Sequence, residues 1–153
     1  MWVLAKKIVL GIHIRRTDFM QTEQYIEISP TLRYYEAALG ILNINASKDS
    51  IFVASDDLEW VRQQDLFRGM TLSPFTTSLE DLGVLSQCFH LIIGAGTFGW
   101  WSLQLNPHGL KMYYRKEFTK FFRRNAVNLE DYYVPTWRGI TDKDIQSYFH
   151  EEV

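Results

Sequence analysis

Short apolar runs of strand length alternate along the chain with segments in which apolar residues recur at helical spacing. The clearest runs are residues 8–14, 50–55 and 90–96, and shorter candidates are 70–75 and 110–114. The first run carries no charge and is rich in β-branched residues, as expected for a strand covered on both faces. Strands that alternate with helices at this spacing predict an α/β fold, a Rossmann-like parallel sheet with helices on both faces.

Polar residues that could cap a first turn stand where the helices should begin. The predicted starts are Ser29 followed by Pro30, Ser55 or Asp56, Ser78 paired with Asp81, Thr97, and Thr141 paired with Asp144. The pair of Ser78 and Asp81 resembles a capping box in which Asp replaces the usual Glu or Gln, and Thr141 with Asp144 caps the last helix. The last of them predicts a C-terminal helix over 141–150.

The composition excludes several classes of protein. The 153 residues carry 16 basic and 18 acidic side chains, a net charge of −2 that attracts neither nucleic acid nor an anionic surface. Cys88 is the single cysteine, which rules out an internal disulfide, and we expect it to be a buried, inert thiol. No apolar run approaches the roughly 20 residues of a transmembrane helix. The first residues also lack the layout of a signal peptide.

Residues 111–124 depart from this balance, with six basic side chains and one acid, Glu117, for a local charge of +5. Aromatic residues lie between the cations, so a nucleic-acid-binding module is an alternative function. However, the cations form no clean stripe, and the rest of the chain carries −7, that is −2 minus +5. We therefore expect no nucleic-acid partner, and interpret the segment as a solvated face or a contact to another domain.

Unusual polar clusters follow the predicted strands. "HIRRTD" ends the first strand, "SDD" the second, "SPFTTS" the third and "GAGTF" the fourth. Ligands of parallel α/β sheets bind beyond the carboxyl ends of the strands. The clusters therefore predict a binding site at that edge of the sheet.

The adjacent arginines indicate what this site would bind. The guanidinium groups of Arg15 and Arg16 offer a fixed charge and a planar fork of donors that suit a phosphate group, and an ion pair with Asp18 is the alternative. Alternation along the strand places His13 on the same face as Arg15. His13 is either a satisfied core histidine or a contact to a bound base or sugar.

The other clusters have structural alternatives as well. Asp56 could accept hydrogen bonds from a nucleobase or ribose, or cap a helix. Small residues before Thr97 let a backbone approach a ligand. Trp100 and Trp101 are adjacent, so one of them should lie in the core.

Together, "GIHIRRTDF", "FVASDDLEW" and "LSQCFHLIIGAGTFGWW" resemble the α-1,2-fucosyltransferases, glycosyltransferase family 11, over roughly residues 8–137. The resemblance implies one half of a GT-B fold, the C-terminal domain that binds GDP-fucose. It implies inverting transfer of L-fucose to a hydroxyl of a galactoside glycan, with no metal or other cofactor. In a eukaryote it implies a location in the Golgi lumen.

The resemblance also assigns residues. Arg15 and Arg16 match the pair that binds the diphosphate, and His13 and Asp18 complete that motif. Asp56 and Asp57 match the second motif, and Thr97, Phe98 and Trp100 belong to the third. Ser73 and Ser78, from the cluster after the third strand, complete the expected substrate-binding set. The catalytic candidates are Arg16, Asp18 and Glu23, of which Glu23 stands where α-1,6-fucosyltransferases have their proposed base.

We expect residues 1–153 to form a single donor-binding domain, with a core over about 8–137. In the family, an acceptor-side domain and a membrane anchor would precede the first motif, and only about seven residues do so here. One alternative is therefore an inactive remnant that binds GDP-fucose without transferring it. An α-1,6-type fucosyltransferase is a further alternative.

Overall fold

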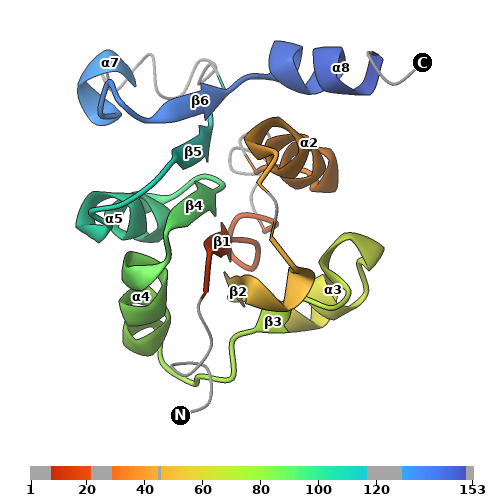
Figure 1. Cartoon of the computed structure of the whole chain (residues 1–153), viewed down its shortest axis with the longest axis vertical. Helices are drawn as coiled ribbons and strands as arrows, with labels where there is room; N and C mark the ends of the chain where they lie inside the picture. Colours follow the sequence, from red (N-terminus) through yellow and green to blue (C-terminus); the bar gives the residue numbers. More distant parts are fainter. Residues whose placement is uncertain (1–7, 22–28, 45, 117–128, 151–153) are drawn as a thin grey trace.

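A computed structural model describes residues 8–21, 29–44, 46–116 and 129–150 (Figure 1). Within these ranges, one six-stranded sheet has the order β3-β2-β1-β4-β5-β6, and all neighbouring strands are parallel. The strands are β1 Leu10–Ile14, β2 Ile51–Ser55, β3 Thr71–Leu72, β4 His90–Ile93, β5 Lys111–Tyr114 and β6 Arg138–Ile140. The predicted parallel, Rossmann-like sheet is confirmed.

β1 occupies the centre of the sheet, where Gly11 pairs with Phe52 of β2 and with Leu91 of β4. The chain first adds β2 and β3 on one side of β1, and then β4, β5 and β6 on the other. Strand order thus reverses between β1 and β4. In doubly wound sheets this reversal opens a crevice at the carboxyl ends of the strands, where ligands bind.

Helices cover both faces of the sheet (Figure 1). One face carries α2 Leu32–Leu42, α3 Leu58–Arg62 and α8 Asp142–His150, and the other carries α4 Ser78–Gln87, α5 Thr97–Leu105 and α7 Leu129–Tyr132. Short 3-10 turns, η2 Lys48–Ser50 and η3 Asp65–Phe67, precede β2 and β3. Both layers are needed because a parallel strand has two apolar faces to bury.

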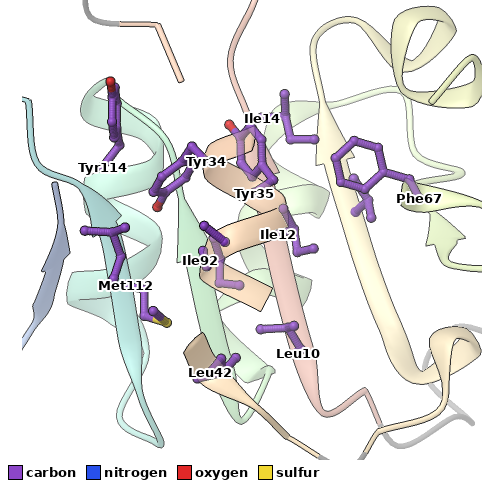
Figure 2. Close-up of a cluster of buried hydrophobic side chains, with 14 of the residues drawn as sticks. Leu10, Ile12, Ile14, Tyr34, Tyr35, Leu42, Phe67, Ile92, Met112 and Tyr114 are labelled. Carbon is purple, nitrogen blue, oxygen red and sulfur yellow. The ribbon is translucent and has the colours of Figure 1, made fainter. Parts of the chain in front are cut away.

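The alternation of β1 divides its side chains between the two helical layers. Leu10, Ile12 and Ile14 pack with Tyr34 and Tyr35 of α2, and each of these side chains is at most 1% exposed (Figure 2). The intervening residues of β1 face α4 and α5 instead. The predicted orientation of the strand is therefore confirmed.

The predicted start of α2 was wrong. The helix begins at Leu32 with Thr31 as its N-cap, whereas Ser29 and Pro30 precede it. A Cβ atom built on Gly94, after β4, would lie only 2.4 Å from Pro30 Cγ. Pro30 is thus packed against Gly94 at the end of β4, ahead of the helix.

The predicted N-caps of α3 and α4 were wrong by one or two residues. Asp57, rather than Ser55 or Asp56, caps α3 and accepts from the Trp60 N–H at 3.1 Å. Thr77, rather than Ser78, caps α4 and accepts from the Glu80 N–H at 3.4 Å, whereas Asp81 accepts from the Ser73 hydroxyl. The capping-box partner at this end is Glu80, which accepts from the Thr77 hydroxyl at 2.6 Å.

The predicted cap of α8 by Thr141 and Asp144 is confirmed. The Thr141 N–H donates to Asp144 Oδ2 at 2.7 Å, and the Asp144 N–H donates to Thr141 Oγ1 at 3.2 Å. The short elements α7 and β6 were not predicted. With four and three residues, neither shows a period that a pattern could reveal.

Cys88 is buried at the C-terminal end of α4, and burial raises the pKa of its thiol to about 12. The expected burial of Cys88 is confirmed. Across the described ranges, we find no helix with both the length and the apolar character that crossing a bilayer requires.

Gly11 allows α4 to approach β1 closely. A Cβ at this position would lie 2.6 Å from Leu91 Cδ2 and 2.9 Å from both Cys88 Sγ and Leu85 Cδ2. We therefore expect Gly11→Ala to lower the free energy of unfolding by about 1–3 kcal/mol through overpacking. Chemical denaturation measures this. The control is Gly83→Ala in α4, where a Cβ meets nothing within 4 Å and should raise stability by up to about 1 kcal/mol. Equal effects of the two substitutions would contradict the close packing.

Candidate functional site

The carboxyl ends of β1, β2 and β4 meet at one groove, which consists of two adjoining cavities. The β2-side cavity, of about 200 Å³, lies between the end of β2 and the start of α4. The β4-side cavity, of about 190 Å³, lies between the loop after β1 and the start of α5. His13, Arg15 and Phe98 line both cavities. The groove thus lies at the carboxyl ends of the strands, where the polar clusters predicted a binding site, and it coincides with the reversal of strand order.

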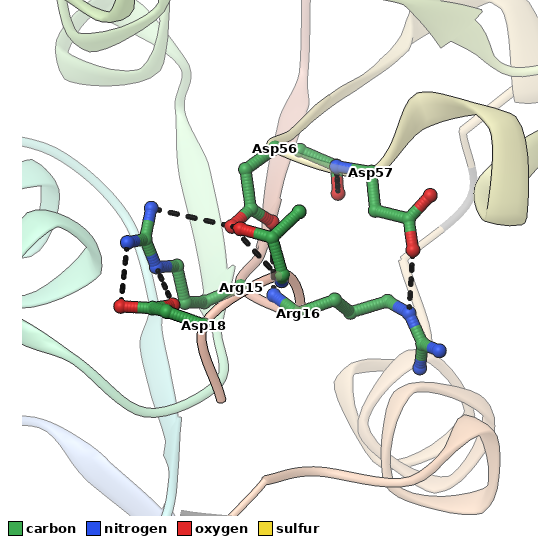
Figure 3. Close-up of polar contacts among 7 residues, drawn as sticks. Arg15, Arg16, Asp18, Asp56 and Asp57 are labelled. Atoms are coloured by element: carbon green, nitrogen blue, oxygen red, sulfur yellow. Dashed lines mark hydrogen bonds and ion pairs between the residues drawn. The ribbon is translucent and has the colours of Figure 1, made fainter. Parts of the chain in front are cut away.

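Arg15 places its guanidinium in this groove, between two carboxylates (Figure 3). Its Nε and Nη2 lie 2.8 and 2.9 Å from the two oxygens of Asp18, and its Nη1 lies 3.2 Å from Asp56 Oδ2. The hydrogen bond to Asp18 raises the pKa of Arg15 and lowers the pKa of Asp18. The ion pair that the sequence left open as an alternative is therefore present. Arg15 remains a permanent cation that lines both cavities.

Arg16 points the opposite way (Figure 3). Its Nε donates to Asp57 Oδ2 at 3.2 Å, and its guanidinium carbon lies 3.8 Å from the ring centroid of Trp60. The Arg16 side chain lines neither the β2-side nor the β4-side cavity. The adjacent arginines therefore do not form a pair of cations in the groove as the structure stands.

Asp56 holds the loop after β1 against the end of β2. Its carboxylate accepts from the backbone N–H groups of Arg16 at 2.8 Å and Thr17 at 3.1 Å, and from the Thr17 hydroxyl at 2.5 Å. With Arg15, the carboxylate has four donors nearby. Its structural role is this clamp, and the next residue, Asp57, caps α3.

His13 is buried at the junction of the two cavities. Its ring lies 4.7 Å from that of Phe98, and its Nδ1 has no hydrogen-bond partner among the described residues. A Cβ on Gly99 would lie 3.1 Å from this nitrogen, so α5 packs close to the imidazole. Burial lowers the pKa of His13 to about 4. The histidine is therefore neutral near pH 7, and its unpartnered Nδ1 is buried against α5.

The N-termini of two helices open into the groove. Thr77 and Ser78 begin α4 at the β2-side cavity, and Gly96 and Thr97 begin α5 at the β4-side cavity. Gly96 has φ +102°, a conformation that favours glycine, and it offers no side chain to the first turn of α5. The first N–H groups of a helix lack partners within the helix and attract anions.

Other predicted site residues serve the scaffold. The Ser73 hydroxyl donates to Asp81 at 2.5 Å and accepts from the Phe75 N–H at 3.1 Å, which fixes the turn after β3. Trp100 donates from its indole to the Tyr132 carbonyl at 2.7 Å, while Trp101 is 53% exposed. One tryptophan therefore packs inward, as expected. Glu23 lies outside the described residues, as do 117–128 of the basic segment.

Several groove residues were not among the predicted ones. Asp81 lines the β2-side cavity, and burial raises the pKa of its carboxyl group. Phe19 lines the β4-side cavity, and Thr76 and Thr77 line the other. Thr76 and Thr77 belong to the cluster "SPFTTS" after the third predicted strand, so the sequence pattern could have identified them as site residues. Asp81 was interpreted only as a cap, because its approach to Ser73 depends on how α4 folds back toward β3.

Searching the described part of the chain gives no group of three or more histidine, cysteine and acidic side chains that could hold a metal ion.

The family model for glycosyl transferase family 11 matches residues 5–141, which include every element that forms the groove. The chain belongs to glycosyltransferase family 11. The resemblance seen in the three sequence motifs is confirmed, and the groove is the family member's candidate ligand site.

Curated relatives match most of this chain at low sequence identity. Galactoside alpha-(1,2)-fucosyltransferase 1 of Leontocebus fuscicollis, of Saimiri boliviensis boliviensis and of Alouatta caraya are each 26% identical to the chain over 144 residues. Each match covers 86% of this chain and 38% of the relative, so the chain spans well under half the length of these proteins. No solved structure matches the chain.

The buried imidazole of His13 makes stability depend on pH. The unfolded chain binds this proton near pH 6.5, but the folded chain binds it only near pH 4, so acidification favours the unfolded state. We expect His13 to remove up to about 3 kcal/mol of stability between pH 6.5 and 4. Denaturation at several pH values should show a shallower pH dependence for His13→Gln than for the native chain. His108→Gln, which removes an exposed histidine, is the control. An unchanged slope in His13→Gln would contradict the assignment.

Proposed function

We propose that this chain is the donor-binding domain of an inverting fucosyltransferase, which transfers L-fucose from GDP-fucose to a hydroxyl of a galactoside glycan in α-1,2 linkage. The observation that carries the proposal is Arg15, a permanent cation in a groove at the reversal of strand order, flanked by two helix N-termini. Membership of family 11 and relatives named galactoside alpha-(1,2)-fucosyltransferase support the reaction class.

The groove offers different chemistry to each part of such a donor. The diphosphate would lie at Arg15, where the two cavities meet, with the N–H groups at the start of α5, which have no side-chain cap, as further donors. The β2-side cavity has oxygen acceptors, Asp81 and the hydroxyl of Ser78, that suit the N–H groups of a nucleobase or the hydroxyls of a ribose. Phe98 adds an apolar wall.

Transfer would proceed by one displacement. The acceptor hydroxyl attacks the anomeric carbon of fucose while the bond from that carbon to the diphosphate oxygen breaks, and GDP leaves with the electron pair. Negative charge grows on the β-phosphate, so a fixed cation such as Arg15 stabilises the transition state more than the ground state. A carboxylate would take the hydroxyl proton. The predicted base Glu23 and the catalytic assignments of Arg16 and Asp18 remain proposals.

The whole reaction needs more than this groove. The chain spans 38% of the relatives' length, so a separate acceptor-side domain belongs to the proposal, as does a Golgi lumenal location in a eukaryote. Chains of the same fold could bind GDP-fucose without transferring it, or form an α-1,6 linkage. The next two experiments separate these possibilities.

Binding tests the donor site first. We expect calorimetric titration to show micromolar binding of GDP and GDP-fucose, weakened about 10- to 100-fold in Arg15→Ala, because a charge-assisted hydrogen bond is lost. Arg16→Ala should weaken binding less, since its side chain stacks on Trp60 outside both cavities. Arg68→Ala, which removes an exposed arginine paired with Asp65 in η3, is the matched control. A folded native chain that binds neither nucleotide at millimolar concentration would refute the donor site.

Transfer tests the reaction. Incubation of the chain with GDP-fucose and a terminal galactoside should give a product whose linkage is assigned as α-1,2 by NMR. Binding without product from this chain, with product once an acceptor-side domain is supplied, supports a donor-binding half. Binding without product in both cases identifies an inactive remnant. An α-1,6 product would replace the proposed linkage.

A further inference from the structure

The two carboxylates that contact Arg15 are held in different ways. Asp56 accepts from two backbone N–H groups and from the Thr17 hydroxyl, in addition to its ion pair with Arg15. Asp18 binds Arg15 through both carboxylate oxygens, and the backbone N–H groups of Asp18 and Phe19 also interact with its carboxylate. Asp56 therefore clamps the loop to the end of β2, whereas the contacts of Asp18 lie within the loop itself, and Arg15 is the strongest of them.

Asp18 is also the more accessible partner. Its side chain is 52% exposed, compared with 20% for Asp56, and it lines the β4-side cavity. The pair of oxygens that it presents to Nε and Nη2 of Arg15 matches the geometry in which a guanidinium binds two phosphate oxygens. Asp18 thus occupies the donors that an anionic ligand of the groove would use.

We propose that Asp18 is a displaceable counter-anion of Arg15, which occupies the anion position of the empty groove and sets which anions can enter. A ligand must release Asp18 before it binds Arg15 bidentately. The exchange of one bidentate anion for another contributes little binding free energy. A small anion such as inorganic phosphate therefore has no advantage over Asp18. A ligand displaces it only when it makes further contacts, at the N-terminus of α5 or in the β2-side cavity.

This inference rests on the proposed function only in naming a nucleoside diphosphate as the ligand. It assigns Asp18 a role in selectivity, and it predicts the direction of an effect that a purely structural residue would not produce. Removal of a supporting residue weakens binding, whereas removal of a competing anion strengthens it.

The experiment is calorimetric titration of the native chain and of Asp18→Asn with GDP and with inorganic pyrophosphate. Exposed ion pairs have modest strength, so we expect both ligands to bind Asp18→Asn about fivefold more tightly. Asp65→Asn is the matched control, because Asp65 and Arg68 form an exposed pair with the same i,i+3 spacing. Thermal denaturation of each variant checks its fold, and Asp18→Ser replaces Asp18→Asn if the latter does not fold.

A second comparison tests whether the effect acts through Arg15. In an Arg15→Ala background, the added Asp18→Asn change should leave pyrophosphate affinity unaltered. Tightening of the same size without Arg15 would mean a general loss of negative charge and would overturn the proposal. Equal or weaker binding of pyrophosphate to Asp18→Asn than to the native chain would also overturn it.

The donor proposal can fail separately. If the native chain binds no GDP, yet Asp18→Asn binds pyrophosphate more tightly than the native chain, the counter-anion role stands without the donor. If GDP binds the native chain and Asp18→Asn binds it no more tightly, the donor site stands and the counter-anion is refuted. Failure of both proteins to bind either ligand refutes both proposals.

Discussion

The groove depends on the hydrogen bonds of one carboxylate, that of Asp56. It stands at the end of β2 and accepts from two successive N–H groups and a hydroxyl of the loop that leaves β1. Because these N–H groups lie beyond the last residue of β1, they have no acceptor in a neighbouring strand, and the Asp56 carboxylate accepts from them instead. This clamp fixes the direction of the chain at Arg15 and Arg16, and thereby decides which guanidinium reaches the groove.

Because of this clamp, the side chains of Arg15 and Arg16 have different roles. Arg15 lies between Asp18 and Asp56 in the groove, whereas Arg16 stacks on Trp60 and pairs with Asp57 beside α3. A planar, permanently charged guanidinium suits both environments, one as an anion ligand and one as a cation over an aromatic ring. The protein thereby places one cation in the groove and uses its neighbour to attach α3 to the loop.

Close helix packing completes the site. Gly11 lets α4 approach β1, and Gly99 lets α5 approach His13. Larger side chains at these positions would push the helices outward, and the N-termini of both helices would move away from the groove. Electrostatics at the site therefore depends on van der Waals packing in the layer beneath it, since partial charges at helix ends act only at short range.

The sequence by itself determined the parallel α/β fold, the face on which His13 lies, and the edge of the sheet where the polar clusters meet. These follow from local periodicity and from the rule that parallel strands end together. Only the tertiary structure decided which polar residue plays which part. Asp57 rather than Asp56 caps α3, Asp81 turns to Ser73, and the arginines separate, because several acceptors near in sequence compete for the same donors. The distances between secondary-structure elements determine which acceptor binds each donor, and a local sequence pattern does not contain these distances.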